Sequence, residues 1–318
     1  MWTIPRSCEK ERGLKVEKKR TDSRYPLQRR APFREWSPSV HYARHQRLPT
    51  GVLAERRLYD FELLYVSQGE AATTMRGQRY TLSAGQLIFL PSGVYHRNEV
   101  VSEPEARFLG IHFDFFDELD IQTESDMIVN EESLQPEKFA REALSDAFPA
   151  LSSRVVYTVP LVFVQTMEQV VQEFAMRPVG YELACKALML NLLAQLARLP
   201  RVPADAAASP HGPKLQALMA AIEAEPARPW TNRDAAERLH LSVDHAAKLF
   251  KQAAGLSPGE FVHAVRHREA RRLLRETDLP VERVGESVGY GDIHYFSRIF
   301  RRHEGISPTE YRKLSRIL

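Results

Sequence analysis

Hydrophobic and polar residues alternate along much of the chain between residues 32 and 129. In the stretch ARFLGIHFDF, the odd-numbered residues from Leu109 to Phe115 share one face of an extended strand, and the even-numbered residues share the other. Several short stretches of this kind are separated by turns rich in glycine or proline, as in QLIFLPSG. The pattern predicts an antiparallel β-barrel or sandwich over residues 32–129.

The hydrophobic period changes to that of a helix over residues 130–199. Three stretches fit this period, and we predict helices over residues 136–148, 160–176 and 181–199. The last of them is apolar around much of its circumference, so it needs a surface to pack against. That surface lies within the chain or on a second copy, and the pattern leaves both open.

Two stretches lack a regular period. Residues 1–31 are basic and poor in apolar residues, which predicts a mobile tail, although a basic arm that touches DNA fits the same composition. Residues 200–213, PRVPADAAASPHGP, are rich in proline, alanine and small polar residues and predict a linker. The linker separates the first two segments from a last domain at residues 214–318.

The last domain contains an internal repeat at an offset of 50 residues. SVDHAAKLFKQAAGLSPGEF begins at Ser242, and DIHYFSRIFRRHEGISPTEY begins at Asp292. In each copy the first residue can cap a helix, and Gly255 or Gly305 can end that helix in the left-handed conformation. A Ser-Pro pair then begins another helix. A shorter helix and a tight turn precede each copy, so the repeat predicts two helix-turn-helix units.

Helical spacing gives the second helix of each unit an apolar inner face and a polar outer face. When such a helix lies in the major groove of DNA, its outer face supplies the contacts to bases and phosphates. We therefore predict DNA contacts from Ser242, Asp244, His245, Lys248 and Lys251 in the first unit, and from Asp292, His294, Ser297, Arg298 and Arg301 in the second.

A predicted helix over residues 258–277 joins the two units and, at 1.5 Å per residue, is about 30 Å long. Successive major grooves on one face of DNA lie about 34 Å apart, so this length suits two helices that read one face of a duplex. The charge distribution agrees: residues 214–318 contain 18 Lys and Arg against 14 Asp and Glu, whereas residues 31–213 contain 16 against 23.

The stretch VGYGDIHYFSRIFRRHEGISPTEYR resembles the second-motif signature of the AraC/XylS family of bacterial transcription regulators, and RHREARRLL is also similar to family sequences. The stretch from Leu63 to His96, with its P-x-G-x-x-H ending, resembles the cupin-type sensor of that family. The resemblance implies seven helices in the last domain and a barrel that binds a small effector, often a sugar or related metabolite. It also implies helices that dimerise, RNA polymerase as a partner, and activation as the usual outcome.

The first unit departs from the family pattern. His240 stands where the turn usually has glycine, and Ala246 and Ala247 stand where a larger apolar residue and a polar residue are usual. The carboxylate of Asp244 also repels phosphate. We therefore expect base specificity to depend mainly on the second unit, through His294 and Arg298, with Arg298 able to pair with guanine.

We expect the effector to bind polar or aromatic side chains near the barrel interior, because aromatic faces stack on sugars while Arg, Gln and His bond hydroxyls. The candidates are Arg57, Tyr65, Gln68, Tyr80, His96 and His112. Metal-dependent cupin enzymes carry a pair of histidines on the strand that here reads YDFELLYV, and this strand has none. We therefore expect neither a metal nor another cofactor.

Together these patterns predict an α+β protein. A cupin-like antiparallel β-barrel at residues 32–129 is followed by a helical dimerisation segment at residues 130–199, and two helix-turn-helix units occupy residues 214–318. No apolar run is long enough to span a membrane, and no apolar run follows the charged N-terminus. Cys8 and Cys185 lie in unlike contexts, so we expect no disulfide and a cytoplasmic location.

The predicted function is that of a homodimeric, sequence-specific transcription regulator, not an enzyme, that binds promoter DNA and responds to a small molecule. Two alternatives remain open. A cupin enzyme with a DNA-targeting module would bind a metal and turn over a substrate. An architectural DNA-binding protein would bind all sequences with similar affinity and a steep dependence on salt.

Overall fold

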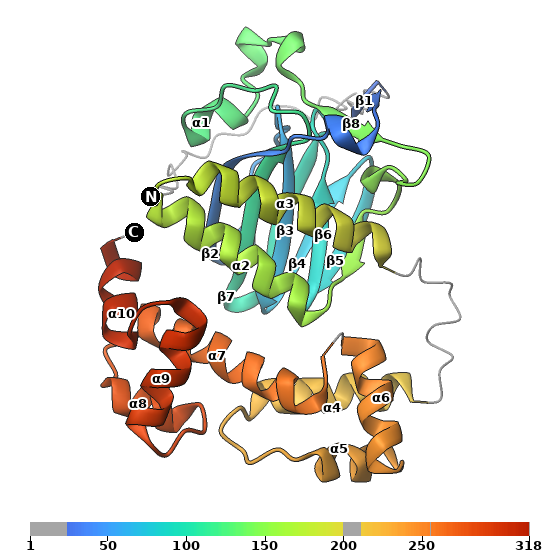
Figure 1. Cartoon of the computed structure of the whole chain (residues 1–318). Coiled ribbons are helices and arrows are strands. Elements are labelled where there is room, and N and C mark those ends of the chain that lie inside the picture. The colour runs from blue at the N-terminus through green and yellow to red at the C-terminus, as the bar shows by residue number, and fades with distance from the viewer. Residues whose placement is uncertain (1–23, 200–210, 255, 318) are drawn as a thin grey trace, which may run out of the picture.

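Seven strands of the N-terminal part form one antiparallel sheet that curls into a near-closed barrel (Figure 1). The computed structural model describes residues 24–199, 211–254 and 256–317. The long β7 (His96–Asp114) is the centre of the sheet, since it pairs with three other strands. The remaining strands are β2 (Ser39–Val52), β3 (Phe61–Gln68), β4 (Glu70–Met75), β5 (Gln78–Ser83), β6 (Gln86–Leu90) and β9 (Val156–Thr158).

The alternation predicted around residues 106–115 is confirmed, and the structure shows which face is which. The odd-numbered residues from Leu109 to Phe115 are buried in one apolar cluster with side chains of α2 (Leu161–Met176) and α3 (Tyr181–Arg198). These two helices lie side by side across the outside of the sheet (Figure 1). On the other face, Phe108 and His112 line the interior of the barrel. The barrel side that holds a cavity is therefore the even-numbered face.

Two predictions about the segments around the barrel are wrong. Residues 136–148 do not form a helix: they contain a 3-10 turn at Pro136–Lys138 and the short strand β8 (Arg141–Leu144). β8 pairs in parallel with β1 (Leu27–Arg30), so residues 27–30 are not part of a mobile tail. β8 and β9 both fall within residues 130–199, which become helical only at α2 because the apolar residues before it pack on the barrel. Residues 1–23 lie outside the described part of the chain.

Several short elements complete the N-terminal part. They are the helix α1 (Glu124–Met127) and the 3-10 turns Phe33–Glu35, Glu131–Ser133 and Leu151–Ser153. Of the predicted linker, residues 200–210 lie outside the described residues, and the structure continues with α4 (Gly212–Ala224). None of the helices that the structure describes is both long and apolar enough to cross a membrane.

The described part of the last domain contains seven helices, the number that the resemblance implied. The first helix-turn-helix unit is α5 (Asn232–Leu239) with α6 (Val243–Ala254), and the second is α8 (Val281–Ser287) with α9 (Ile293–Glu304). The long α7 (Pro258–Glu276) joins the units, which lie at its two ends (Figure 1). α4 precedes the first unit, and α10 (Pro308–Ile317) follows the second.

The repeat predicted at an offset of 50 residues is also present in the hydrogen bonds. Ser257 forms a capping box with Glu260 at the start of α7, and Ser307 bonds Glu310 in the same way at the start of α10. α9 begins at Asp292, whose Oδ1 accepts hydrogen bonds from two backbone amides at 2.7 and 3.1 Å, and ends at Gly305 with a φ of 75°. These local signals explain why the repeat predicted the helices of this domain closely.

Candidate nucleic-acid interface and sensor cavity

α6 and α9 have matching inner and outer faces. Ala246 and Phe250 of α6 are fully buried, as are Phe296 and Phe300 at the equivalent positions of α9. The opposite side of each helix is open to solvent, and it carries the predicted DNA contacts. The exposed members are Ser242, Asp244, His245, Lys248 and Lys251 in the first unit, and Asp292, His294, Arg298 and Arg301 in the second, while Ser297 is half-buried.

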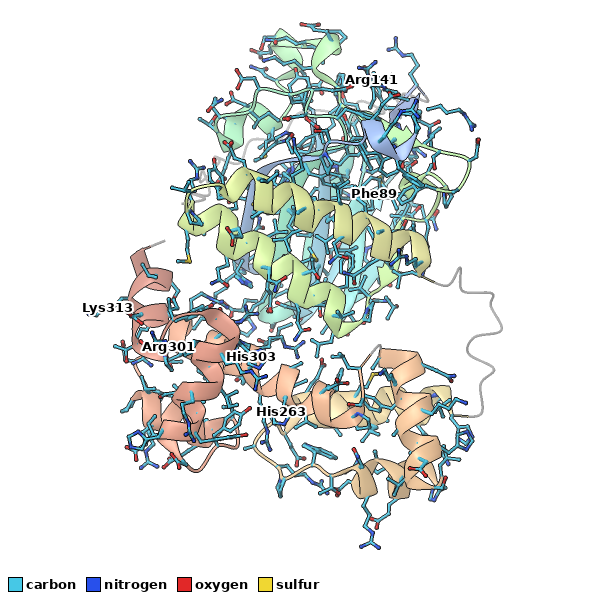
Figure 2. The ribbon with its side chains drawn as sticks, viewed as in Figure 1. Phe89, Arg141, His263, Arg301, His303 and Lys313 are labelled. Atoms are coloured by element: carbon cyan, nitrogen blue, oxygen red, sulfur yellow. The ribbon has the colours of Figure 1, made fainter. Side chains whose placement is uncertain are left out.

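The basic side chains on these outer faces differ from those on α7. Each α7 arginine is engaged: for example, Arg268 bonds Glu223 at 3.0 Å and Arg272 bonds Glu269 and Glu276. In the part of the chain that the structure describes, no ion pair involves Lys248, Lys251, Arg298 or Arg301. Figure 2 shows Arg301 among the surface side chains of the second unit. These four cations are available to a polyanion without breaking an existing contact.

The two predicted caps play a structural part in the helices. The Asp292 carboxylate accepts from His294 N and Tyr295 N, and these hydrogen bonds lower its pKa. The Ser242 hydroxyl accepts more weakly from His245 N, at 3.4 Å. Both side chains therefore help to begin the helices that carry the outer faces.

The turn of the first unit contains a strained residue. His240 ends α5 with a φ of 56° and a ψ of 46°, the left-handed region that glycine tolerates and that costs free energy in a residue with a side chain. In the second unit the turn has Gly289, with a φ of 89°. The departure noted in the sequence, histidine in place of glycine, therefore falls where the backbone requires the left-handed conformation.

Arg266 of α7 holds the two units together. Its guanidinium donates to the carbonyl oxygens of Pro226 at 2.9 Å and Arg228 at 3.0 Å, before the first unit, and to that of Gly289 at 3.3 Å, in the turn of the second. Arg266 thus links the loop before the first unit and the turn of the second unit to the same point of α7.

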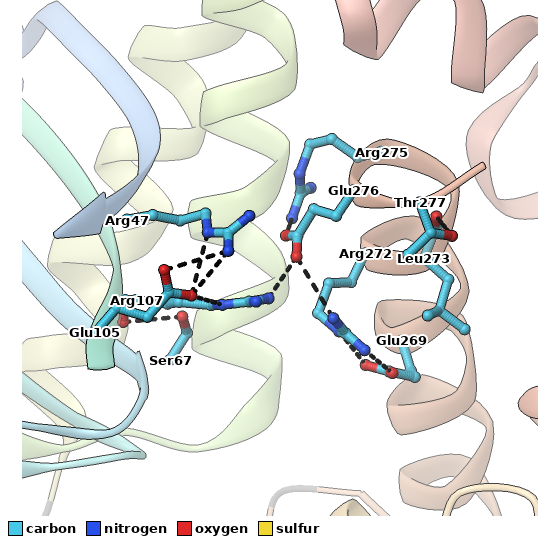
Figure 3. A network of polar contacts seen from close by, with 10 residues as sticks. All are labelled: Arg47, Ser67, Glu105, Arg107, Glu269, Arg272, Leu273, Arg275, Glu276 and Thr277. Carbon is cyan, nitrogen blue, oxygen red and sulfur yellow. Dashed lines mark hydrogen bonds and ion pairs between the residues drawn. The ribbon is translucent and has the colours of Figure 1, made fainter. Parts of the chain in front are cut away.

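α7 also contacts the sensor part, and we call this contact region the junction. Figure 3 shows its outer half, where Arg107 of the barrel pairs with Glu276 of α7. Arg107 also donates to Glu105 at 3.2 Å, and Glu105 binds Arg47 at 3.0 Å. Charges of both signs alternate across this half of the junction.

The inner half of the junction is buried. Arg271 of α7 pairs with Glu168 of α2, and its other nitrogen lies 3.4 Å from Glu304 at the end of α9. Glu304 also accepts from His267 at 2.6 Å. Burial opposes ionisation of Glu304, but His267 and Arg271 hold its pKa below the usual range. A continuous set of polar contacts therefore joins the sensor helix α2 to the helix that carries the second outer face.

The barrel encloses a cavity of about 1390 Å³. Its walls come from the even-numbered faces of β3 and β7, from β2 and β4, and from α2. Arg271 and Arg275 of α7 also line it, so the cavity reaches the junction. The cavity is therefore bordered by both the sensor part and the DNA-binding part.

A chain of buried charges crosses one end of this cavity. Arg56 bonds Glu62 at 3.3 Å, and Glu62 lies 3.5 Å from His112. His112 lies 3.2 Å from Asp60, which continues to His41 at 3.0 Å. The signs alternate along this series, which we call the polar chain.

The polar chain shifts the pKa values of its members. Burial alone would raise the pKa of Glu62, but the charges of His112 and Arg56 lower it to about 2. Burial likewise opposes the charged form of His112, but Glu62 and Asp60 raise its pKa to about 10. Asp114 and Asp60 raise the pKa of His41 to about 9 against the same effect of burial. All three groups are therefore charged at neutral pH.

The structure brings three of the six candidate effector residues to the cavity. His96 and His112 line it and are almost fully buried. Arg57 also lies at its edge, but its guanidinium forms two hydrogen bonds to Glu131, at 2.8 and 2.9 Å, and sits 4.8 Å from the ring centre of Tyr95. Arg57 is thus held by its own neighbours.

The other three candidates lie away from the cavity, which corrects the expectation. Tyr65 is on the odd-numbered face of β3 and packs into the apolar cluster under α2 and α3. Gln68 is exposed at the end of that strand. The hydroxyl of Tyr80 donates to Gln78 at 3.0 Å on the surface. Glu62 was not among the residues that the sequence predicted to line the cavity. Glu62 lies two residues before Leu64 on the same strand, so both side chains point to the inner face, and this spacing was the available signal.

The histidines and carboxylates of the barrel do not form a metal centre. Among the described residues, no group of three or more His, Cys, Asp or Glu side chains is arranged to hold a metal ion. In the polar chain the histidine nitrogens face carboxylates as hydrogen-bond donors, so their lone pairs are not directed at a common point.

Comparisons with known proteins match both parts of the chain. The family described as a cupin domain matches residues 48–112, and the family described as a helix-turn-helix domain matches residues 235–314. An uncharacterized HTH-type transcriptional regulator, YisR of Bacillus subtilis (strain 168), is 28% identical over 259 residues, which are 80% of this chain and 86% of YisR. The HTH-type transcriptional activator RhaS of Escherichia fergusonii is 26% identical and covers 86% of this chain and 92% of RhaS.

A solved structure also matches the last domain. It is a transcriptional regulator of the AraC-type DNA-binding domain-containing proteins from Chromobacterium violaceum, 30% identical over 32% of this chain and 92% of that chain, with a TM-score of 0.31. Both relatives align with this chain over most of its length and most of their own. Together with the two family matches they show that the chain belongs to the AraC family of helix-turn-helix transcription regulators, with an N-terminal cupin domain and a C-terminal DNA-binding domain.

Proposed function

We propose that the protein is a sequence-specific, effector-responsive activator that binds promoter DNA in the cytoplasm. The observation that carries this proposal is the pair of outer faces on α6 and α9, each with two unpaired cations, at opposite ends of the single helix α7. The 19 residues of α7 give it a length of about 28 Å. This length is close to the spacing of two major grooves on one face of DNA.

The effector in this proposal is a small metabolite that binds in the barrel cavity. Arg271 lines that cavity and also pairs with Glu168 at the junction, so an occupant acts on the contact between the two domains. An effector shifts the balance between two states only by binding one more tightly than the other. The sugar or related metabolite expected from the resemblance belongs to this proposal, and so does RNA polymerase as the partner. The name of the relative RhaS as an activator supports activation.

We further propose that the protein acts as a homodimer through the outer face of α3. Leu183 is 74% exposed and Leu190, two turns further along, is 39% exposed. Ala187 lies between them on the same side and is also exposed. Apolar side chains in a row on a helix surface favour contact with another helix, and a second copy of α3 offers the same row.

An in-vitro selection tests the function. The purified full-length protein is incubated with fragments of its source genome at physiological salt, and the retained fragments are sequenced. We expect enrichment of a few upstream regions that share a motif about two helical turns long. Retention without sequence preference would instead support an architectural DNA-binding protein and would overturn the proposal.

Two variants sharpen this selection. Arg298→Ala removes a cation of the second outer face. We expect the enriched motif to show a weaker base preference at the positions that Arg298 contacts. Arg79→Ala serves as the matched control, because Arg79 is an exposed barrel arginine that pairs with Glu99 far from both outer faces. The control should retain the same fragments as the unmodified protein.

A further inference from the structure

His96 presents a hydrogen-bond acceptor that nothing in the described protein satisfies. It begins β7, lines the cavity and is fully buried. Its Nδ1 lies 3.2 Å from the carbonyl oxygen of Val94. Because a carbonyl oxygen only accepts hydrogen bonds, Nδ1 carries the proton, and Nε2 of the neutral ring is an acceptor. Among the described residues Nε2 has no hydrogen-bond partner.

The surroundings keep His96 neutral. Burial, aided by the nearby charge of Arg56, lowers the pKa of His96 to about 4. At neutral pH the ring therefore cannot satisfy Nε2 by taking up a proton. A buried acceptor without a donor costs free energy, and the cavity that His96 lines is the place from which a donor can come.

Several other polar groups at the cavity are already bonded to each other. Arg56, Glu62 and His112 belong to the polar chain. The Thr73 hydroxyl donates to the side-chain oxygen of Asn98 at 2.8 Å. The hydroxyl groups of a ligand would therefore find these five side chains already engaged.

One part of the inner wall is apolar. Aliphatic and aromatic side chains from β3, β5, β6 and β7 form one buried cluster that borders the cavity. The members that line it include Leu64, Val66, Leu82, Ile88, Val100 and Phe108. Hydroxyl groups buried against this wall would lose their hydrogen bonds to water without replacement, whereas an apolar surface would gain from leaving water.

We propose that the cavity binds a neutral molecule with an apolar body and one hydroxyl or N–H group, which donates a hydrogen bond to Nε2 of His96. This inference rests on the proposed role of the cavity as the effector site and narrows the class of the effector. The single donor fixes the orientation of the molecule, and the apolar wall supplies most of its affinity. A free sugar does not have this division into one polar end and one apolar body.

A pair of probes that differ by one methyl group on oxygen tests the proposal on the full-length protein. 4-Ethylphenol can donate a hydrogen bond, and 4-ethylanisole, its methyl ether, cannot. We expect 4-ethylphenol to bind about tenfold more tightly, which is the effect of one hydrogen bond to a buried acceptor. Dissociation constants are measured by ligand-detected NMR titration, and a set of free pentoses and hexoses is titrated in parallel.

Two variants assign this preference to His96. His96→Phe keeps a ring of similar size and removes the acceptor, so the tenfold preference for the phenol should disappear. His96→Gln places an amide oxygen near the position of Nε2, so it should retain a preference for the donor. The comparison of the two probes on the unmodified protein remains decisive if His96→Phe fails to fold.

Equal affinities of the unmodified protein for the two probes would overturn the proposal, and so would binding of neither probe or tighter binding of a sugar. DNA-binding measurements separate this failure from that of the effector function. A sugar that changes DNA affinity would keep the effector function and overturn the present inference. A phenol that binds as expected but leaves DNA affinity unchanged would support the site and overturn its role as the effector site.

Discussion

Arg271 of α7 and Glu168 of α2 form a buried ion pair, and this pair is the inner contact between the DNA-binding domain and the sensor helices. Neither residue touches the predicted DNA contacts directly. Arg271 also reaches Glu304, the last residue of α9, and it lines the cavity. A change at this pair therefore alters both the sensor and the second outer face.

We predict that Glu168→Gln loosens the junction. The substitution removes one partner of a buried pair, a change that typically costs about 3–5 kcal/mol. Amide hydrogen exchange in α2 and α7 should become faster, and the effect of an effector on DNA affinity should decrease. Hydrogen exchange followed by mass spectrometry measures the first effect.

Glu173→Gln is the matched control for this experiment, because Glu173 lies on the same helix and none of the described ion pairs involves it. Its exchange rates should match those of the unmodified protein. Unchanged exchange in Glu168→Gln would show that the buried pair does not hold the domains together.

Arg298→Ala should weaken binding to the specific site by about 1–3 kcal/mol, the contribution of a bidentate contact to guanine. Lys248→Ala, at the equivalent position of the first unit, should cause a smaller loss that is similar for all sequences. Fluorescence anisotropy with one operator fragment and one unrelated duplex, at a fixed salt concentration, measures both variants. An Arg298→Ala protein with full affinity for the operator would remove Arg298 from the readers of base sequence.

His240→Gly should stabilise the DNA-binding domain. Glycine adopts the left-handed conformation at this position without the strain that histidine carries, so we expect a gain of about 0.5–1 kcal/mol. Differential scanning calorimetry of the full chain measures the transition of this domain. His240→Ala keeps a Cβ atom and should give no gain, and equal behaviour of the two variants would argue against backbone strain.

The polar chain makes the stability of the sensor domain dependent on pH. The pKa values of His41 and His112 are raised to about 9 and about 10. Their contribution to the free energy of unfolding is therefore complete below pH 6.5 and is lost as the pH rises through 9–10. The pKa of Glu62 is lowered to about 2, so its contribution is present above pH 4.5 and is lost as the pH falls towards 2.

Thermal unfolding between pH 6 and pH 10.5 checks the alkaline half of this prediction. The unfolding temperature of the sensor domain should fall over the upper part of that range. In His112→Gln the fall should be smaller, because the variant has no proton to lose at this position. Equal slopes in the two proteins would contradict the assignment of the alkaline loss to His112.

The helix-turn-helix units were predictable because their signals are local. Asp292, Gly305 and Ser307 act within a few residues of their own positions, and the structure places each at the helix end that the sequence indicated. The helix predicted over residues 136–148 was wrong for the opposite reason. Its residues satisfy a helical period, but β8 pairs with β1, more than 100 residues earlier in the chain, and that contact has no local signal.

The effector residues were only partly predictable, because alternation divides a strand into two faces without saying which face is inside. Tyr65 and Glu62 lie on the same strand and are both buried, but of the two it is Glu62 that faces the cavity. A buried Glu62 is stabilised by Arg56, which precedes its strand, and by His112 of β7. Such compensation depends on the closed barrel and does not show in any single stretch of sequence.

The single helix α7 has a consequence for the DNA sites that the proposed function implies. Because α7 holds α6 and α9 at a fixed separation, the protein itself measures the distance between the two groups of bases that it reads. One inserted base pair would turn the second group about one tenth of a turn around the duplex axis, away from α9. Binding sites are thus free to change in composition between the two groups but not in length, and single-base insertions and deletions are the mutations that selection would remove first.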